Sequence, residues 1–258
     1  MEKQTNLTAR QLRRIKSRKL RKAKRAKYLE KNGIKTNNEN TLVEYQMKVP
    51  AIKPRTPKQV IYNDALNNKS IIVCDGPAGC GKTYLAAVHA ADKLMDGTFD
   101  KIVVTRPILT PEDFGTLPGG ELDKFMPFFR PVYDVLVQRL GAKTVADYLK
   151  PEVGKIEILP FAFMRGRSLS NAIIILDEAQ NTTVSQMKLF LTRAGANSQI
   201  IINGDIEQCD LPYSEISGLE DLLTRVKNNN LVSIVNFEDF DCVRSEICNY
   251  ALEIYRDN

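Results

Sequence analysis

Short apolar runs and helical patterns alternate along most of the chain. The mostly apolar runs predict buried strands at 71–74, 102–105, 156–159, 173–176, 200–202 and 231–235. Apolar residues at helical spacing predict helices at 82–95, 121–140, 184–193, 219–226 and 243–255. Buried strands that alternate with helices are typical of an α/β domain with a mostly parallel sheet, and we expect that fold.

A basic segment precedes this domain. Residues 1–35 carry fourteen Lys or Arg against two acids, a net charge of +12, so the rest of this +6 chain has a net charge of −6. Eleven of those cations lie within 10–27, where no acid is present. Clustered cations attract polyanions, so we expect residues 1–36 to form a basic arm that contacts nucleic acid. A solvated tail and a segment on an anionic membrane surface are the alternatives.

The boundaries of this arm follow from local signals. Thr8 begins a capping-box pattern and Gly33 suits a helix C-terminus, so the arm is either helical or disordered. Polar residues and then three prolines, at 50, 54 and 57, indicate a linker over 37–56. We therefore expect three parts: the arm at 1–36, the linker at 37–56 and one large domain at 57–258.

Composition excludes several classes of protein. No run of eighteen apolar residues exists and the N-terminus lacks the apolar stretch of a secretory signal, so we expect a cytoplasmic protein with no membrane partner. The five cysteines include no C-x-x-C pair, which disfavours a zinc ribbon. His89 is the only histidine, so a Ser-His-Asp triad elsewhere in the chain is excluded. We expect His89 itself to be a packing or surface residue.

A glycine-rich motif lies where the first predicted strand meets the first predicted helix. The sequence GPAGCGKT matches G-x-x-x-x-G-K-[ST], in which backbone N–H groups wrap phosphates, Lys82 reaches the β and γ phosphates and the Thr83 hydroxyl binds Mg²⁺. The positive end of the following helix favours the same anion. A turn without a ligand is the alternative. The expected nucleotide-binding residues are Gly76, Pro77, Ala78, Gly79, Cys80, Gly81, Lys82, Thr83 and Tyr84.

A second motif supplies acids for hydrolysis. The apolar run 173–176 leads directly into Asp177 and Glu178, as in a Walker B segment. We expect Asp177 to hold Mg²⁺ through water and Glu178 to orient or deprotonate the attacking water. Ordinary loop acids are the alternative interpretation. Together the two motifs predict hydrolysis of a nucleotide with Mg²⁺ as cofactor.

A third motif indicates a motor-like ATPase. The sequence GDIEQ, 204–208, resembles the G-D-x-x-Q segment of superfamily 1 helicases, and that resemblance implies that Gln208 senses the γ-phosphate. Gln59 lies seventeen residues before Gly76, where those helicases carry a glutamine that reads adenine, so ATP is expected over GTP. A surface glutamine is the alternative. Arg106, at a strand end, is a candidate for contact with a nucleic-acid phosphate.

Seven segments together resemble a known family. They are VVTRP, GTLPG, DKFMPFFRPVYDVL, FMRGRSL, ILDEAQNTT, MKLFLTRAG and NGDIEQCDL, and they span about 56–251. The chain is similar to the PhoH-like ATPases, which implies a RecA-like core like the first motor domain of superfamily 1 helicases, with ATP hydrolysis linked to RNA metabolism. Thr116 and Ser245 depart from the family pattern. The basic arm and small size resemble phage-encoded versions, which act in the host cytoplasm.

The length of the chain bears on its assembly. Only 50 residues follow Gln208, too few for the second motor domain that supplies arginines to ATP in superfamily 1 helicases. We therefore expect a neighbouring subunit to supply the cation in a head-to-tail ring, most simply a hexamer. The candidates, each of which also suits a structural ion pair, are Arg193, Arg244, Arg165 and Arg167.

Taken together, these features predict a Mg²⁺-dependent ATPase that acts on RNA or single-stranded nucleic acid. The alternative is an oligomeric module that ATP switches between partner-binding states without unwinding. The aromatic residues of 121–140 suit a buried core or a base-stacking surface, with the core favoured; they are Phe125, Phe128, Phe129 and Tyr133.

Overall fold

A computed structural model describes residues 52–107, 121–227 and 229–243, and the single positions 247, 250 and 254. The predicted arm at 1–36 and most of the predicted linker lie outside the described residues. So do Thr116, Arg244 and Ser245, together with most of the helix predicted at 243–255. The fold below is that of the described part of the domain.

A six-stranded parallel sheet forms the centre of the domain. Its strand order is β3-β2-β4-β5-β1-β6, and every neighbouring pair runs parallel. The strands are β1 (Ile71–Asp75), β2 (Lys101–Thr105), β3 (Ile156–Ile158), β4 (Ala172–Leu176), β5 (Gln199–Gly204) and β6 (Val232–Asn236). Each predicted strand is found within two residues of its expected ends, so the predicted parallel α/β fold is confirmed.

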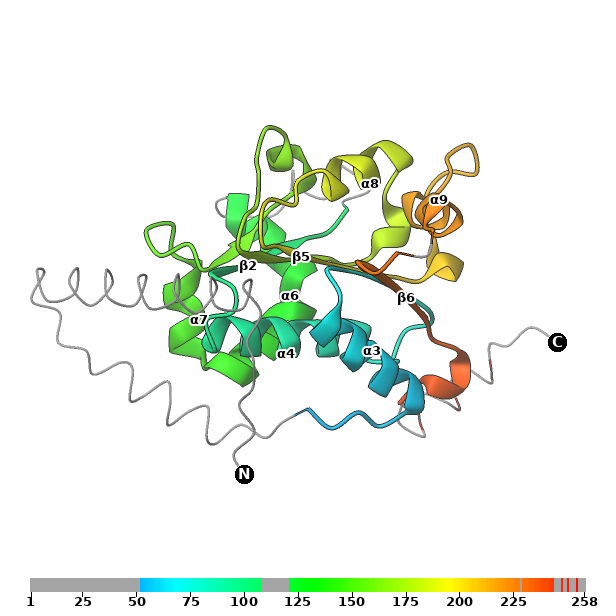
Figure 1. Ribbon diagram of the computed structural model, residues 1–258, viewed down its shortest axis with the longest axis horizontal. Coiled ribbons are helices and arrows are strands. Elements are labelled where there is room, and N and C mark those ends of the chain that lie inside the picture. Colours follow the sequence, from blue (N-terminus) through cyan, green and yellow to red (C-terminus); the bar gives the residue numbers. More distant parts are fainter. Residues whose placement is uncertain are drawn as a thin grey trace, which may run out of the picture. The chain divides into compact units, whose positions relative to one another are not determined.

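Helices cover both faces of this sheet (Figure 1). One face carries α3 (Pro57–Asn68), α4 (Lys82–Met95), α6 (Glu121–Leu140) and α7 (Ala142–Leu149). The other carries α8 (Val184–Leu191) and α9 (Gly218–Arg225). Four short 3-10 turns complete the described elements: η1 (Phe161–Met164), η2 (Ala179–Asn181), η3 (Ile206–Gln208) and η4 (Asp239–Asp241).

The central strands are buried on both sides. Along β4, Ile173 and Ile175 pack into the cluster under α4 and α6, whereas Ile174 and Leu176 pack into the cluster under α8. Because side chains alternate across a strand and both faces are covered, the sequence of such a strand is continuously apolar. This burial explains why the strand predictions from apolar runs succeeded.

The helix predictions were accurate where the apolar stripe is strong. Helices α4 and α6 have the predicted bounds, and α8 and α9 lie within two residues of theirs, whereas α3 and α7 were not predicted. On α6, Phe129 is buried and Phe125, Phe128 and Tyr133 pack against the same core, which confirms the core interpretation of these aromatics. Within the described ranges, no helix has both the length and the apolar character needed to cross a bilayer.

The ends of the parallel strands are level with one another. Thr105 on β2 pairs with Leu176 on β4, which pairs with Ile202 on β5, and Gly204 pairs with Asp75 on β1. The residues that follow β1, β2 and β4 therefore meet at one edge of the sheet. In open parallel sheets this carboxyl edge is where ligands bind.

A buried polar cluster links α3, α4 and β5 at the opposite, amino end of β5. The amide nitrogen of Gln199 donates to the carbonyls of Leu66 and Lys69, both at 2.7 Å. Its oxygen must then accept from His89, whose Nε2 lies 2.9 Å away, so the proton of the neutral imidazole is on Nε2. His89 is buried, which confirms its expected packing role, and burial lowers its pKa to about 4.

The depressed pKa of His89 predicts a loss of stability in mild acid. The unfolded chain binds a proton below about pH 6.5 but the folded chain only below about 4, so stability falls as the pH decreases between these values. The expected loss is on the order of 3 kcal/mol. Urea unfolding of the full chain at a series of pH values measures it. His89→Gln, which keeps a donor for Gln199 but cannot titrate, should weaken the pH dependence in this window; an unchanged dependence would contradict the assignment.

Candidate functional site

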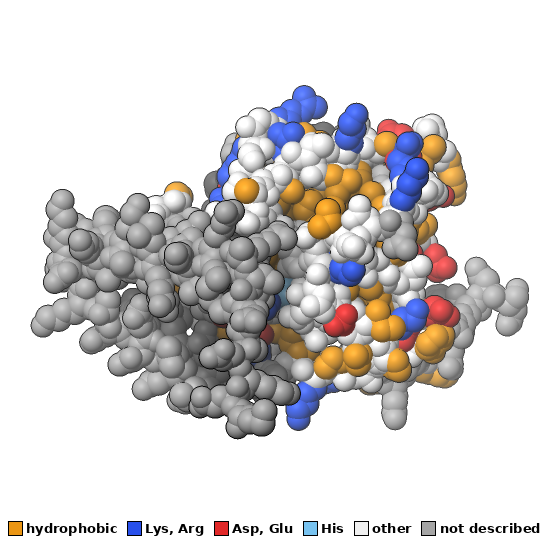
Figure 2. Space-filling view, viewed as in Figure 1, with side chains coloured by type: hydrophobic (Ala, Val, Ile, Leu, Met, Phe, Trp, Pro, Cys, Tyr) orange, Lys and Arg blue, Asp and Glu red, His pale blue; other side chains and the backbone are white. Residues whose placement is uncertain are grey.

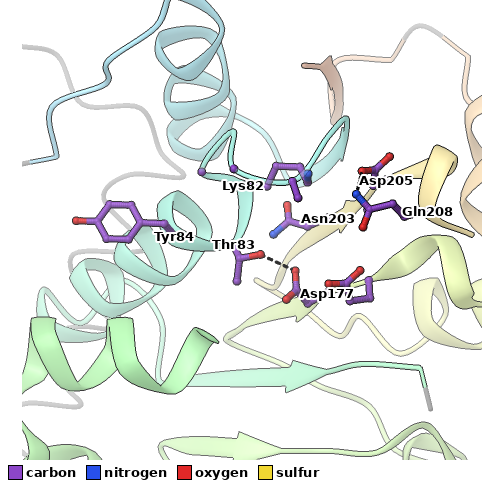
Figure 3. Close-up of a pocket in the computed structure, with 12 residues that line it drawn as sticks. Lys82, Thr83, Tyr84, Asp177, Asn203, Asp205 and Gln208 are labelled. Atoms are coloured by element: carbon purple, nitrogen blue, oxygen red, sulfur yellow. Dashed lines mark hydrogen bonds between the residues drawn. The ribbon is translucent and has the colours of Figure 1, made fainter. Parts of the chain in front are cut away.

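A pocket of about 280 Å³ lies at the carboxyl edge of the sheet, between the ends of β1, β4 and β5 (Figure 3). Its lining combines glycines, one lysine, two hydroxyls and several acids and amides. The lining residues are Ala78, Gly79, Gly81, Lys82, Thr83, Tyr84, Asp177, Glu178, Asn203, Gly204, Asp205 and Gln208. The three sequence motifs, far apart along the chain, thus contribute to one cavity.

The glycine-rich motif forms the loop between β1 and α4. Gly81 precedes the helix with a φ of 86°, in the left-handed region that favours glycine. Lys82 turns back over the loop, where its ammonium donates to the carbonyl of Gly76 and, at 2.9 Å, to that of Pro77. Tyr84 lines the pocket and is 47% exposed. A lysine over a glycine-rich loop suits a phosphate, and binding of nucleotide phosphates by this loop stays a prediction.

Two segments outside the loop donate hydrogen bonds to its backbone carbonyls. The buried Gln59 amide on α3 donates to the Cys80 carbonyl at 2.9 Å and accepts from the Arg55 N–H at 2.8 Å. On the other side, the Val243 N–H donates to the Gly79 carbonyl at 3.1 Å. Gln59 is not among the lining residues of the pocket, so its role in reading adenine stays a prediction, while its contact with the loop backbone is a finding.

Cys80 faces away from the pocket. Its side chain is buried, and its sulfur lies 2.8 Å from the sulfur of Cys242, just before the segment that contacts Gly79. Cys80 therefore belongs to the packing under the loop, and its expected part in nucleotide binding rests on its backbone.

A hydroxyl and a carboxylate from two motifs meet in the pocket. Thr83 Oγ1 donates to Asp177 Oδ1 at 2.8 Å, as the dashed line in Figure 3 marks. Burial raises the pKa of Asp177 to about 6, with the charge of Glu178 adding to the rise and the Thr83 hydrogen bond opposing it. A cation at this point would favour the ionised carboxylate.

These two side chains fit a magnesium ion. Mg²⁺ takes one or two protein oxygens and fills its octahedron with water and phosphate oxygens. Across the described ranges, no group of three or more His, Cys, Asp and Glu is arranged to hold a metal alone. Thr83 and Asp177 therefore match a metal that arrives with phosphates better than a permanent all-protein site.

Glu178 is held in an unusual backbone conformation. Its φ of 55° and ψ of 44° are left-handed, which is uncommon for a residue with a side chain. Its carboxylate lies 3.4 Å from Arg106 Nη2 and accepts from Gln180 Nε2 at 2.7 Å. Arg106 also donates to the Phe128 carbonyl on α6 at 3.1 Å. Arg106 thus helps to position Glu178, the predicted base, at the pocket. The contact with nucleic acid that the sequence suggested for Arg106 stays a prediction.

The GDIEQ segment supplies the far wall of the pocket. Gln208 Nε2 donates to Asp205 Oδ2 at 2.6 Å, and both residues line the cavity. Sensing of the γ-phosphate by Gln208 stays a prediction. Sequence reasoning did not assign Asn203 and Asp205 to the site. Asn203 follows Ile202, the partner of Leu176, and is therefore level with Asp177, while Asp205 comes directly after β5 within the GDIEQ motif.

The candidate arginines for a neighbouring site differ in their surroundings. Arg193 donates to the carbonyls of Leu189 and Arg167, both at 3.2 Å, and Arg167 pairs with Glu157. Arg165, after η1, is exposed. Figure 2 shows Lys and Arg side chains gathered along the upper margin, over the face that carries η1 and α8. Arg193 and Arg167 are therefore engaged within the chain, and Arg244 lies outside the described residues.

A glycine-rich loop with the P-loop sequence, a buried strand ending in two acids and a parallel sheet that joins them define a P-loop NTPase fold with a RecA-like core. The family profile described as PhoH-like protein matches residues 51–256. The chain therefore belongs to the PhoH-like protein family.

Curated relatives support this membership. Protein PhoH of Escherichia coli (strain K12) is 53% identical over 205 residues, which cover 79% of this chain and 58% of that protein. The PhoH-like proteins of Bacillus subtilis (strain 168) and Synechocystis are 43% and 41% identical and are covered over 64% and 62% of their lengths. The chain thus spans about three fifths of the length of these relatives.

A solved structure is similar over a large part of its length. The UvsW helicase from bacteriophage T4 matches 84% of this chain and 77% of its own chain, at 12% identity and a TM-score of 0.41. The fold is defined by the strand order and by the family.

The packing at Gly76 predicts a test of the loop. Gly76 has a φ of 137°, and a Cβ built there would lie 2.5 Å from the Phe237 carbonyl oxygen. Gly76→Ala should therefore lower the free energy of unfolding by roughly 2 to 4 kcal/mol, through strain and overpacking.

The matched control is Gly97→Ala. Gly97 also has a positive φ, 71°, but nothing lies within 4 Å of an added Cβ. Its cost should be about 1 kcal/mol, from backbone strain alone. Denaturant unfolding of both variants makes the comparison, and equal losses would show that the Phe237 contact does not constrain the loop.

Proposed function

We propose that this protein is a Mg²⁺-dependent ATPase that uses hydrolysis to act on RNA or single-stranded nucleic acid. The observation that carries the proposal is the hydrogen bond between Thr83 and Asp177, because it joins the phosphate loop to the Walker B acid inside one pocket. The position of Glu178 beside that pair supports hydrolysis rather than binding alone.

The proposed reaction assigns one task to each side chain. Lys82 moves from the loop carbonyls to the β and γ phosphates, while Thr83 and Asp177 hold the magnesium ion. When bound there, Mg²⁺ would neutralise charge on the phosphate oxygens. Glu178 takes the proton of the attacking water, so ATP and water yield ADP and phosphate. Gln208 detects the γ-phosphate, and Gln59 is the proposed reader of adenine.

The basic arm supports the choice of a nucleic-acid substrate. Residues 1–35 have a net charge of +12, whereas the rest of the chain is negative, so attraction to a polyanion is concentrated in one segment. In this proposal the arm captures the strand, Arg106 contacts its phosphates, and the protein works in the cytoplasm. A nucleotide-switched interaction module is the competing function.

The first experiment measures steady-state ATPase activity of the full chain and of a chain starting at Asn37, with and without single-stranded RNA or DNA. We expect nucleic acid to raise turnover of the full chain and the truncation to reduce that response. The response should also weaken steeply as salt increases, because counterion release drives the arm's binding.

Glu178→Gln is the control for this experiment. Removal of the base should lower turnover by about 10²- to 10⁴-fold while ATP still binds, which shows that the activity belongs to this pocket. A normal rate in Glu178→Gln would refute the hydrolytic site. A rate that is the same with every polymer would favour the switch function over the motor.

We also propose that the active unit is a head-to-tail ring, most simply a hexamer, in which an arginine of one subunit completes the site of the next. Arg165 is the best described candidate, since Arg193 and Arg167 donate to acceptors within the chain. Such an arginine stabilises the charge that develops on the transferred phosphoryl group and is worth roughly 10³- to 10⁵-fold in turnover.

Co-expression of two inactive variants tests this arrangement. Arg165→Ala keeps its own phosphate loop, and Lys82→Ala keeps its arginine, so mixed rings should contain sites with both groups and recover a measurable fraction of ATPase activity. A mixture of Lys82→Ala with Glu178→Gln is the matched control, because each site of that ring lacks one residue of its own. Recovery in neither mixture would reject Arg165 as the residue that acts between subunits.

A further inference from the structure

One buried side-chain donor in the pocket has no acceptor. In the part of the chain that the structure describes, two buried side-chain atoms lack a hydrogen-bond partner: Thr105 Oγ1 and Asn203 Nδ2. Of these two residues, only Asn203 lines the pocket. It is fully buried, at 0% exposure, and sits at the carboxyl edge of β5.

An unpaired amide nitrogen in such a place is unfavourable by itself. A buried donor that loses its water without gaining a partner costs about 1 to 3 kcal/mol. Buried polar groups in folded proteins are nearly always paired, so an exception at the wall of a cavity indicates a group that a ligand satisfies. The NH₂ group can only donate, which excludes a role as a metal ligand and favours an anionic acceptor.

The orientation of the amide is set from the other side. The Tyr62 hydroxyl on α3 lies 2.7 Å from Asn203 Oδ1. Burial raises the pKa of Tyr62 well above its usual value, so the hydroxyl keeps its proton and donates it to that oxygen. Because Asn203 Oδ1 accepts from Tyr62, the Nδ2 atom is the one that can donate to a ligand in the pocket.

The position of Asn203 relative to the phosphate machinery completes the argument. β5 lies between β1, which leads into the phosphate loop, and β4, which ends at Asp177. Asn203 pairs with Cys74 on β1 and follows Ile202, the partner of Leu176. Figure 3 shows its side chain between Lys82 and the Thr83–Asp177 pair.

Three other side chains that line the pocket already donate to acceptors. Lys82 donates to two loop carbonyls, Thr83 to Asp177 and Gln208 to Asp205. The Thr83 hydroxyl has a single hydrogen and must exchange its partner when an anion enters, whereas the Lys82 ammonium has three hydrogens and the Gln208 amide has two. The Asn203 amide needs no such exchange, so its bond to an anion is gained in full.

We propose that Asn203 Nδ2 donates a hydrogen bond to the terminal phosphate of a bound nucleoside triphosphate. This inference rests on the proposed function and adds a residue that distinguishes the triphosphate from the diphosphate. Asn203 binds the group that hydrolysis removes, so its bond is lost when phosphate leaves. Through Tyr62 the same amide connects the state of the nucleotide to α3.

The test is equilibrium binding of ADP and of a non-hydrolysable imido analogue of ATP, each with Mg²⁺, measured by calorimetry on the full chain. Asn203→Asp is the informative variant, since it keeps the size of the side chain and an acceptor for Tyr62 but replaces the donor by a negative oxygen. We expect its affinity for the ATP analogue to fall about 10- to 100-fold, and its affinity for ADP to change less than about 3-fold.

Asn67→Asp is the matched control. It makes the same change of charge at an exposed position of α3 outside the pocket, and both affinities should stay within about 2-fold of the original chain. Tyr62→Phe is a second variant, which leaves Asn203 in place and removes only the hydroxyl that orients it. We expect it to weaken the ATP analogue selectively, by a smaller factor than Asn203→Asp.

Three outcomes would overturn the inference. Equal losses for ADP and the ATP analogue in Asn203→Asp would indicate a structural role only, and no loss for either would show that the amide does not contact phosphate. If Asn203→Asp does not fold, as thermal unfolding would reveal, an unselective Tyr62→Phe decides against the inference. Failure of the unaltered chain to bind either nucleotide would instead reject the proposed function itself.

Discussion

The site depends on the parallel register of β1, β4 and β5. Because Leu176 is level with Ile202 and Asp75 with Gly204, the residues beyond the strand ends meet at one edge. The hydrogen bond between Thr83 and Asp177 joins segments 94 residues apart and exists only in this register. A slip of one residue would turn every side chain of a strand to the opposite face, which continuous burial on both sides of the sheet prevents.

The phosphate loop is a second constraint, since it must present N–H groups to an anion without collapsing. Its backbone is supported from outside: Gln59 bonds to the Cys80 carbonyl, Val243 bonds to the Gly79 carbonyl, and Phe237 leaves no space for a side chain at Gly76. These contacts fix carbonyls of the loop, and the Gly76 N–H donates to the Gly204 carbonyl at 3.2 Å. Support from α3 and from the segment after β6 thus gives these outer elements a direct part in the site.

The sequence predicted the fold well because the relevant signals are local. Apolar runs defined all six strands, and strong apolar stripes defined α4 and α6. Helix α3 was missed since Val60 and Ile61 are exposed while Tyr62 and Leu66 are buried, which weakens the helical pattern. The phosphate loop and Walker B acids are likewise contiguous motifs and were found. The Arg106–Glu178 pair and Asn203 were not, because their roles arise from strands that are neighbours in the sheet but distant in the chain.

The wall of the pocket shows how such a site can respond to the identity of its ligand. Four of its polar side chains are paired with one another, Thr83 with Asp177 and Gln208 with Asp205, and Lys82 donates to loop carbonyls, so an anion that enters competes with these partners. Such a pocket has two alternative hydrogen-bonded states, one with its side chains bonded within the protein and one with them bonded to the anion. A ligand shifts the population between these states only through contacts that it makes in one of them. The γ-phosphate is the part of ATP that ADP lacks, so groups that reach it are the ones able to report hydrolysis. Asn203 and Glu178 both line the pocket, from the ends of β5 and β4, and through Tyr62 and Arg106 each is linked to a helix on the same face of the sheet, α3 and α6.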